Sequence, residues 1–481
     1  MTLGFLFYTF YDVSSIAIRL FMLCYVPQRH NPTTAMSWLL AIYLWPWMGL
    51  LLYGVFGSTA LPRERIVRHE ALLKRLRPER KTFRRTASEN PFCLPEELAR
   101  FGDLAEKLGD MPITSGNDLA LIDDASLFVK ILCGEIAKAK KSVHLLFYIF
   151  ALDSLTEPLF EELEKAARRG VECLLLVDAL GSKGFLKRDT ERLSAAGVRI
   201  VRALPPGLLR RTATTARYDL RNHRKIAVID GTVGFTGSHN VIEPSYGGKA
   251  GGRNWHDLTL RLTGPVVAEL QVVFLEDWYV ETGELLPRQE SFSKPDCSGL
   301  GVVQVLPSGP SYPLQNFQRL VVAALHASRE QITITTPYLI PDEELLHSLE
   351  TAVLGGVKIR LVVPEKGDQF LVGSAAKAYF SAFLAMGVEI WLYQEGILHA
   401  KTMTVDGNLA FLGTSNFDIR SFALNFELNL ILYGEEESAS ILAAQEKYIA
   451  YSRRLAAEEW SSLSPPVRVL HGITKLFSPL L

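Results

Sequence analysis

The sequence has almost no net charge, few cysteines and no metal-binding pattern. Its 51 Lys and Arg are balanced by 52 Asp and Glu, which leaves a formal net charge of −1. A chain this neutral has no overall field to attract nucleic acid, so we predict no nucleic-acid partner. The five cysteines are odd in number and include no Cys-x-x-Cys pair, which indicates reduced thiols in a cytoplasmic body. Because Asp, Glu and His do not cluster at metal-ligand spacing, we predict no metal and no other cofactor.

Long apolar runs are confined to the first sixty residues. Residues 35–56 carry no charge, and at about 1.5 Å per residue they are long enough to cross a hydrocarbon core of about 30 Å. Residues 3–25 are equally long but include Asp12 and Arg19, and they lack the basic start and small-residue cleavage site of a signal peptide. We predict that residues 1–60 form a hairpin of two transmembrane helices, with an interfacial helix as the alternative for the first.

The next segment, residues 61–112, is a basic arm followed by a linker. Residues 61–85 contain ten Lys or Arg against three Glu. Positively charged flanks of membrane helices stay in the cytoplasm, so we expect a multi-pass membrane protein with a cytoplasmic catalytic body. The arm either lies on anionic headgroups, at about 1 kcal/mol for each basic residue near the surface, or is a solvated helix.

Beyond the linker, strand-like and helix-like patterns alternate in two units, residues 113–290 and 291–481. Apolar runs of strand length alternate with helix-length segments that stop at glycines such as Gly170 and Gly387. This alternation predicts an α/β fold with mainly parallel sheets covered by helices. The first unit carries an insertion, residues 204–219, which is a surface loop or a membrane-facing lip. The second unit ends in an apolar tail.

One pattern of six residues occurs once in each unit, 176 residues apart. After each histidine come a lysine at +2, an aspartate at +7, a glycine at +14, a hydroxyl residue at +15 and an asparagine at +17. Apolar periodicity sets only which face of an element is buried, so a constant polar spacing must have a chemical cause. The copies are His223, Lys225, Asp230, Gly237, Ser238 and Asn240, and His399, Lys401, Asp406, Gly413, Thr414 and Asn416.

This pattern predicts a phosphate site. A histidine and a lysine two residues apart on a strand project from one face, and the turn after each aspartate folds a second strand back beside them. Ammonium, imidazole, amide and hydroxyl donors together suit phosphate oxygens. With two histidines, one can attack phosphorus while the other protonates the leaving oxygen. The predicted phosphate ligands are Lys225, Lys401, Asn240, Asn416, Ser238 and Thr414.

The duplicated His-x-Lys-x₄-Asp pattern closely resembles the signature of the phospholipase D superfamily. More narrowly, the chain is similar to bacterial cardiolipin synthases in its apolar N-terminus and in four segments, Trp255-His-Asp257, Thr336-Pro-Tyr-Leu-Ile-Pro-Asp342, Leu398-His-Ala-Lys401 and Arg420-Ser-Phe-Ala-Leu-Asn-Phe-Glu427. One departure is His256, where the family more often has Arg. The resemblance covers nearly the whole chain and implies two pseudo-symmetric halves that share one active site.

The resemblance also implies roles for four carboxylates. Asp257 and Glu427 open apolar strands 34 and 28 residues after the histidine of their own half, and they are expected to orient the histidines. The alternative is that they are solvent-facing acids at strand ends. The family signature includes Asp230 and Asp406 among the catalytic residues, although their position in turns indicates a structural role.

The resemblance therefore implies a phosphatidyltransferase of the bacterial inner membrane. His223 is expected to attack one phosphatidylglycerol while His399 protonates the departing glycerol, and a second phosphatidylglycerol then accepts the phosphatidyl group to give cardiolipin. The expected partners are phosphatidylglycerol and anionic membrane lipids. The alternatives are a hydrolytic phospholipase D, a nuclease of the same superfamily and a catalytically inactive membrane scaffold. The motif does not distinguish water from lipid as acceptor, but a scaffold would be expected to lose a motif residue, and none is lost.

Overall fold

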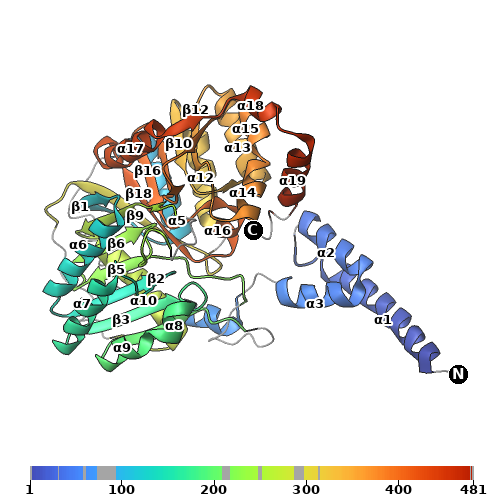
Figure 1. Ribbon diagram of the computed structural model, residues 1–481, viewed down its shortest axis with the longest axis horizontal. Helices are drawn as coiled ribbons and strands as arrows, with labels where there is room; N and C mark the ends of the chain where they lie inside the picture. Colours follow the sequence, from blue (N-terminus) through green and yellow to red (C-terminus); the bar gives the residue numbers. More distant parts are fainter. Residues whose placement is uncertain are drawn as a thin grey trace.

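The computed structural model describes residues 3–30, 32–57, 61–72, 94–207, 217–246, 252–286, 297–312, 315–476 and 478. Figure 1 shows two α/β halves lying against each other and a group of N-terminal helices that projects from one side. The first half is coloured cyan to yellow and the second mainly yellow to red, so the strands of each half come from one continuous stretch of chain.

One 15-stranded sheet passes through both halves. From the centre through the first half its strands are β1 (Ile113–Ile122), β8 (Thr259–Thr263), β6 (Val233–Gly237), β5 (Ile226–Ile229), β2 (Ser142–Phe147), β3 (Glu172–Asp178) and β4 (Arg199–Ala203). From the centre through the second half they are β9 (Gly301–Ser308), β18 (Glu427–Tyr433), β16 (Leu409–Gly413), β15 (Thr402–Val405), β10 (Gln331–Thr335), β12 (Lys358–Pro364), β13 (Glu389–Tyr393) and β19 (Ser452–Arg454). Apart from β19 the two orders correspond strand for strand about the β1–β9 pair, so the halves are pseudo-symmetric.

The sheet is mixed, and the prediction of mainly parallel pairing is wrong. Within the described sheet, only β2–β3, β3–β4, β10–β12 and β12–β13 pair in parallel. These strands are connected through helices, as parallel neighbours require. The motif strands β5–β6 and β15–β16 are joined by tight turns, and a tight turn can connect only antiparallel strands.

Helices cover both faces of the sheet. In the first half α6 (Ala125–Lys138), α7 (Glu157–Arg168), α8 (Lys183–Arg188) and α9 (Thr190–Ala195) bury their apolar faces in one core cluster. In the second half α12 (Asn316–Ala327), α13 (Glu343–Leu354), α14 (Phe370–Lys377) and α15 (Phe380–Met386) do the same, together with α5 (Glu96–Gly109). A third cluster joins the halves through α10 (Val266–Thr282) and α17 (Glu435–Ala450), and α10 is buried along most of its length because it lies at this junction. Shorter helices are α16 (Ile419–Ala423), α18 (Ala457–Ser461) and α19 (Pro465–Lys475).

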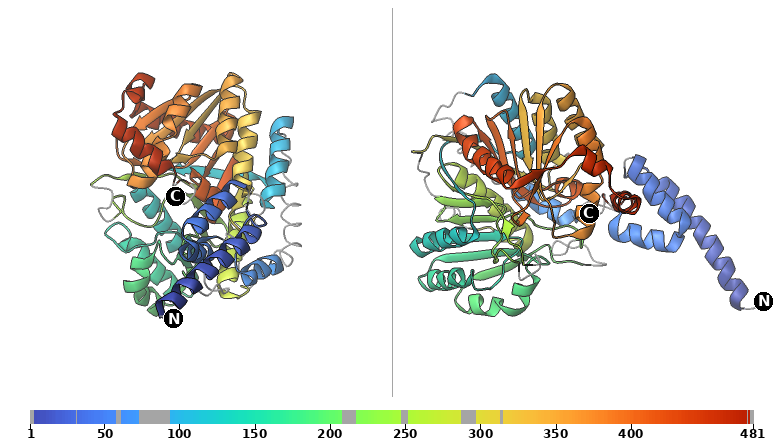
Figure 2. Two further views of the ribbon diagram at one scale, coloured as in Figure 1. Left: turned by 90° about the vertical axis from the view of Figure 1, so that its right-hand side faces the viewer. Right: turned by 45° about the horizontal axis from the view of Figure 1, so that its top comes forward.

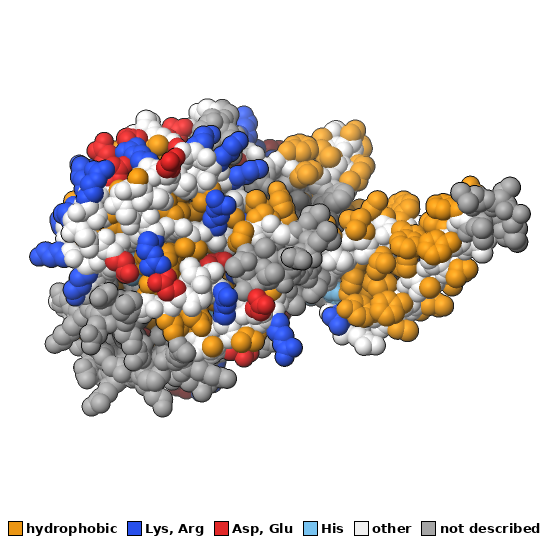
Figure 3. Space-filling view, turned by 90° about the horizontal axis from the view of Figure 1, so that it is seen from below, with side chains coloured by type: hydrophobic (Ala, Val, Ile, Leu, Met, Phe, Trp, Pro, Cys, Tyr) orange, Lys and Arg blue, Asp and Glu red, His pale blue; other side chains and the backbone are white. Residues whose placement is uncertain are grey.

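The N-terminal region differs from the predicted transmembrane hairpin. Among the described residues, α1 (Leu3–Tyr25) is the one helix long and apolar enough to cross a membrane, over Phe7–Tyr25. The second predicted span, residues 35–56, is divided between α2 (Pro32–Leu44) and α3 (Pro46–Phe56). Figure 3 shows apolar side chains over much of these projecting helices, as contact with lipid requires.

The break between α2 and α3 has a local cause. Trp45 leaves the helical conformation, with φ −136° and ψ 83°, and Pro46 has no N–H with which to continue α2. The two helices then pack closely, because Gly49 faces the backbone of Ile42: a Cβ added at Gly49 would lie 2.6 Å from the Ile42 Cα. The uncharged run therefore forms two packed helices instead of one span.

The basic arm is described only as far as residue 72, and its seven Lys and Arg at positions 74–85 lie outside the described residues. Arg65 does not point towards lipid headgroups. Its side chain is 2% exposed and donates two hydrogen bonds to the Glu281 carboxylate of α10, at 2.6 and 2.8 Å. In the insertion, Arg217 Nη1 donates to the Phe56 carbonyl at the end of α3, at 3.0 Å, and residues 208–216 lie outside the described residues. Both contacts tie the N-terminal region to the catalytic body.

Candidate active site

Both motif copies occupy the same place in the fold. His223 and Lys225 immediately precede β5, and His399 and Lys401 immediately precede β15. The strands β5 and β15 are equivalent strands on the two sides of the sheet centre. The copies meet in one site, since His223 Nδ1 lies 3.1 Å from the carbonyl oxygen of Thr414 in the other copy.

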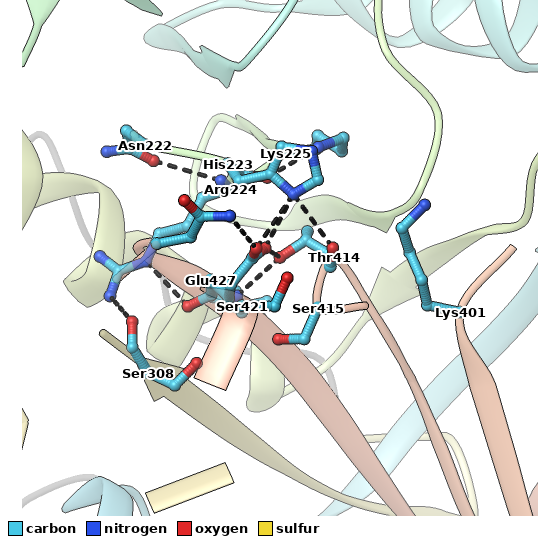
Figure 4. A network of polar contacts seen from close by, with 12 residues as sticks. Asn222, His223, Arg224, Lys225, Ser308, Lys401, Thr414, Ser415, Ser421 and Glu427 are labelled. Carbon is cyan, nitrogen blue, oxygen red and sulfur yellow. Dashed lines mark hydrogen bonds and ion pairs between the residues drawn. The ribbon is translucent and has the colours of Figure 1, made fainter. Parts of the chain in front are cut away.

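Each histidine is held by a carboxylate from the opposite half. His223 Nδ1 lies 3.0 and 3.1 Å from the two Glu427 oxygens (Figure 4), and His399 Nδ1 lies 2.6 Å from Asp257 Oδ1. The sequence spacing had indicated a pairing within each half, and the structure shows a crossed one. Both carboxylates are buried, so they are not solvent-facing acids at strand ends.

Short strands that cross between the halves produce this pairing. The two-residue strand β7 (Trp255–His256) pairs in parallel with β14 (Ile397–Leu398), which places Asp257 beside His399. Equivalently, Asn222 pairs in parallel with Phe426, the residue before Glu427. The backbone N–H of each histidine donates to the residue that precedes its carboxylate, at 2.8 and 2.9 Å. The crossing is therefore built into the backbone of both halves.

The electrostatics favour the neutral form of both imidazoles. Burial lowers the pKa of both histidines, that of His399 to about 3, and the facing carboxylates offset only part of this effect. Burial by itself raises the pKa of Asp257 and Glu427, but the facing histidines and lysines outweigh it and hold both pKa values below the usual range. Because the Thr414 carbonyl and the Glu427 carboxylate can only accept, His223 Nδ1 carries the proton and Nε2 keeps its lone pair.

Two buried lysines supply the positive charge. Lys225 and Lys401 are each 2% exposed, and each Nζ donates to the carbonyl oxygen of the histidine in its own motif. Burial lowers the pKa of Lys225 to about 8 and of Lys401 to about 7, although the Glu427 and Asp257 carboxylates favour their charged forms. A bound anion would add a further counter-charge, so the site is suited to a phosphate group.

Known proteins share this duplicated arrangement. The family model described as "Cardiolipin synthase, PLD-like domain" matches residues 132–278 and 321–448, one copy in each half. "Cardiolipin synthase A" of Pectobacterium carotovorum subsp. carotovorum is 35% identical over 481 residues, covering 98% of this chain and 96% of that protein. This chain belongs to the cardiolipin synthase family. The resemblance to the phospholipase D superfamily is thereby confirmed, and the chain is a phosphatidyltransferase of that superfamily.

Two further comparisons agree with this assignment to the cardiolipin synthase family. "Cardiolipin synthase A" of Serratia proteamaculans is 33% identical over 482 residues, with the same coverage of both chains. The crystal structure of phosphatidylserine synthase from Haemophilus influenzae matches 79% of this chain and 100% of that chain, with a TM-score of 0.59 and 14% identity. At that identity the match supports the fold alone.

The predicted hydroxyl ligands of phosphate are engaged elsewhere. Ser238 and Thr414 accept the backbone N–H of Leu258 and Leu428, both at 2.9 Å. These N–H groups belong to the residues that follow Asp257 and Glu427 in the sequence. The Thr414 hydroxyl also donates to Glu427 Oε2 at 2.5 Å. Their contacts therefore favour positioning of the two carboxylates over phosphate binding.

The two asparagines differ in their surroundings. Asn240 accepts the Ile149 N–H at 3.1 Å and donates to the Tyr246 hydroxyl at 3.0 Å. Asn416 Oδ1 is buried and has no hydrogen-bond partner among the described residues. Asn416 therefore has free capacity to bind a polar group of the substrate.

The aspartates of the signature lie away from the site, at the opposite ends of β5 and β15 from the histidines. Their backbones take positive φ values of 52° and 49° in the hairpin turns. The Asp230 carboxylate accepts the N–H groups of Lys140, Lys141 and Ser142, and the Asp406 carboxylate those of Arg329, Glu330 and Gln331. Asp230 and Asp406 thus join each hairpin to the start of β2 or β10, and their contacts support a structural role.

Sequence reasoning missed aromatic side chains beside the histidines. Tyr148 lies edge-on to His223 at 4.8 Å between ring centroids, and Trp255 lies 4.3 Å from His399 with Tyr246 stacked on it. Trp255 was visible in a family segment, whereas Tyr148 and Tyr246 belong to no repeat or motif. His256, the departure from the family pattern, contacts the Glu395 carbonyl at 3.0 Å instead of a site residue.

A buried frame behind His223 was also missed. Arg224, between the motif histidine and lysine, donates to the Glu427 carbonyl at 3.0 Å (Figure 4). It also donates to Asp277 of α10 at 2.8 Å. Asn222 donates to the other Asp277 oxygen at 2.9 Å. One turn further along α10, Glu281 binds Arg65, so the segment that follows the N-terminal helices braces the helix that holds the motif.

Removal of Arg65 is expected to destabilise the protein and weaken this frame. Arg65→Ala leaves the Glu281 carboxylate buried without its partner, which should cost about 3–5 kcal/mol of unfolding free energy. Denaturant unfolding in detergent measures this loss. Arg100→Ala is the matched control, because the Arg100–Glu96 pair is about four-fifths exposed and should contribute no more than about 1 kcal/mol. Equal losses in both variants would contradict a bracing role for Arg65.

Anion binding is expected to weaken as pH rises. Burial lowers the pKa of Lys401 to about 7 and that of Lys225 to about 8. A bound anion favours the charged form of both, so anion binding above these pKa values requires proton uptake. Sulfate is a suitable anion because it does not titrate in this range. Above pH 8 its inhibition constant should rise about tenfold for each pH unit if one lysine must take up a proton on binding, and about a hundredfold if both must. Lys401→Arg keeps its charge throughout and should flatten the profile; an equally steep profile would contradict this assignment.

Proposed function

We propose that the protein joins two phosphatidylglycerol molecules into cardiolipin and glycerol through a phosphohistidine. The observation that carries this proposal is the pair of histidines, each hydrogen-bonded to a buried carboxylate, beside two buried lysines. Such a site suits transfer of a phosphatidyl group to a lipid hydroxyl instead of to water, because its charged groups are already removed from solvent. Nothing in the site requires a metal, since Lys225 and Lys401 supply the positive charge.

In the first step the Nε2 lone pair of His223 attacks phosphorus, and the bond from phosphorus to the glycerol oxygen breaks. His399 donates the proton that the departing glycerol needs. Its resting pKa is low, but a phosphodiester anion held between the lysines raises it, and Asp257 stabilises the imidazolium. Glu427 balances the positive charge that develops on His223.

In the second step neutral His399 removes a proton from the headgroup hydroxyl of another phosphatidylglycerol. The hydroxyl oxygen attacks phosphorus, the nitrogen–phosphorus bond breaks, and His223 returns to its neutral form. Asn416 Oδ1, which has no partner among the described residues, would accept a hydrogen bond from a glycerol hydroxyl.

The proposed location is the cytoplasmic face of the bacterial inner membrane. Helix α1 is consistent with membrane anchoring, and the basic segment that follows supports a cytoplasmic body. The donor and acceptor would then both be lipids of one bilayer, already concentrated and oriented beside the site.

The reaction balance tests the proposal. Protein reconstituted in phosphatidylglycerol alone should release about one glycerol for each cardiolipin formed, because one headgroup leaves for each phosphoryl transfer. Phosphatidic acid should remain a minor product in a mass-spectrometric assay of the lipids. Phosphatidic acid as the main product, with cardiolipin at trace level, would replace this proposal by a hydrolytic phospholipase D.

A further inference from the structure

The catalytic body has one concentration of exposed apolar side chains. Among described residues from 94 onwards, twelve large apolar side chains are exposed, and half of them lie on α14, on α19 or at the end of α19. A few scattered exposed apolar residues are normal, but six on two adjacent helices need an explanation. They are Phe370, Leu371, Val469, Leu470, Ile473 and Leu476.

The two helices pack against each other with their apolar groups outward. On α19 the inward side is defined by three residues: His471 stacks on Trp460, Thr474 is buried, and Lys475 lies over the Tyr379 ring at 4.5 Å. Val469 and Ile473 lie one turn apart on the outer side, 59% and 51% exposed. This is an amphipathic helix fixed by its polar side, with an apolar side that no described residue covers.

The charges around this surface identify its partner. The two helices contain the basic residues Lys377, Arg468 and Lys475 and no Asp or Glu. A helix with an apolar face and basic flanks is suited to the interface of an anionic bilayer. Figures 1 and 2 show α19 on the side of the catalytic body from which the N-terminal helices project, so the surface faces the side on which membrane anchoring by α1 is proposed.

The same surface begins at the edge of the active site. The segment that leads into α14 carries Asp368, which accepts a hydrogen bond from the Tyr338 hydroxyl. In the same segment the Lys366 carbonyl accepts a hydrogen bond from Arg253 Nη1 at 2.7 Å, and Arg253 lies two residues before Trp255, the ring beside His399. Phe370, two residues after Asp368, is 70% exposed. The exposed apolar side chains of α14 thus begin directly after a segment that is hydrogen-bonded to neighbours of the active site.

We propose that α14 and α19 form a second membrane-contact surface, which inserts its apolar side chains into an anionic bilayer and holds the entrance of the active site at the lipid headgroups. This inference rests on the proposed function for its lipid substrate. A phosphatidylglycerol headgroup would then reach Lys401 over the Phe370 edge while its acyl chains remain in the bilayer.

Fluorescence quenching tests the insertion directly. The full-length protein, with its five cysteines replaced, carries an environment-sensitive fluorophore on Ile473→Cys or Leu371→Cys and is reconstituted in phosphatidylglycerol vesicles. Nitroxide-bearing lipids should quench both positions, and a water-soluble quencher should not. Leu354→Cys is the matched control, because Leu354 is 82% exposed but is the last residue of α13, which leads into the first residue of β12, whereas α14 follows the last residue of that strand. It should show the reverse pattern.

Two outcomes would overturn the proposal. Water-soluble quenching at Ile473 and Leu371 as strong as at Leu354 would show that the surface lies in solvent. Protection from both quenchers would show that it is buried against a second copy of the chain.

Turnover provides a second test that does not depend on labelling. The ratio of turnover on vesicles to turnover on monomeric short-chain phosphatidylglycerol should fall about tenfold in the double variant Val469→Gln/Ile473→Gln. The ratio should not change in Leu354→Gln, and equal ratios in both variants would contradict the proposal. If the wild-type protein makes no cardiolipin from either substrate, the proposed function fails, while the quenching result still decides whether the surface binds lipid.

Discussion

Replacing either His223 or His399 by alanine is expected to lower cardiolipin formation by roughly 10⁴-fold or more, and replacing both should lower it no further. The reason is that the two imidazoles act on one phosphate. The two histidines lie in one site. The charge of Lys401 helps to lower the pKa of His223 in the other motif, and the charge of Lys225 likewise helps to lower the pKa of His399. Groups that work as one unit give non-additive losses. The measurement is the initial rate with phosphatidylglycerol in reconstituted vesicles.

His347→Ala is the control for this experiment, because His347 lies exposed on α13 and should leave the rate within about twofold of wild type. A single His223 or His399 variant that keeps more than about 1% of the wild-type rate, a loss of less than 3 kcal/mol of transition-state stabilisation, would contradict the shared-site mechanism.

Replacing either crossed carboxylate is expected to cost roughly 10³ to 10⁴-fold in turnover. In Glu427→Gln the new amide can donate to His223 Nδ1, which moves the ring proton to Nε2 and removes the lone pair that attacks phosphorus. Asp257→Asn should act in the same way on His399. Nitrogen NMR of histidine-labelled protein reports which ring nitrogen carries the proton, independently of activity.

The NMR result also tests the crossing itself. Glu427→Gln should change the tautomer of His223 and leave that of His399 as it is, whereas Asp257→Asn should do the opposite. Glu435→Gln, an exposed acid at the start of α17, should change neither ring. If Glu427→Gln instead alters His399, the carboxylates act within their own halves and the crossed arrangement is wrong.

The family and the central residues of the site could be predicted from the sequence, because both are marked by polar residue types that recur at constant spacing. The repeated His-x-Lys pattern identified four residues that the structure places together, and it indicated a structural role for Asp230 and Asp406. Hydrogen-bonding capacity alone, however, does not show where a side chain's partners are. Ser238 and Thr414 carry suitable hydroxyls, yet backbone N–H groups occupy them.

The N-terminal region shows a second limit of sequence reasoning. Hydropathy and length describe residues 35–56 as one span, because both measures sum over a window and ignore backbone geometry. Trp45 and Pro46 interrupt the helix, and Gly49 lets α3 pack on α2. The backbone conformation at Trp45 and Pro46 thus ends the helix, although the composition of residues 35–56 would allow one continuous span.

By itself the sequence determined that this protein belongs to a duplicated phosphotransfer family, that its repeated histidines and lysines form one set, and that an apolar segment precedes them, because residue types and spacings carry that information along the chain. Only the tertiary structure decided that each carboxylate serves the histidine of the other half, that Arg65 braces the catalytic frame and that α14 and α19 present one apolar surface. Each of these depends on contacts between residues far apart in sequence, and spacing along a chain does not specify which distant segments meet when strands pair and helices pack.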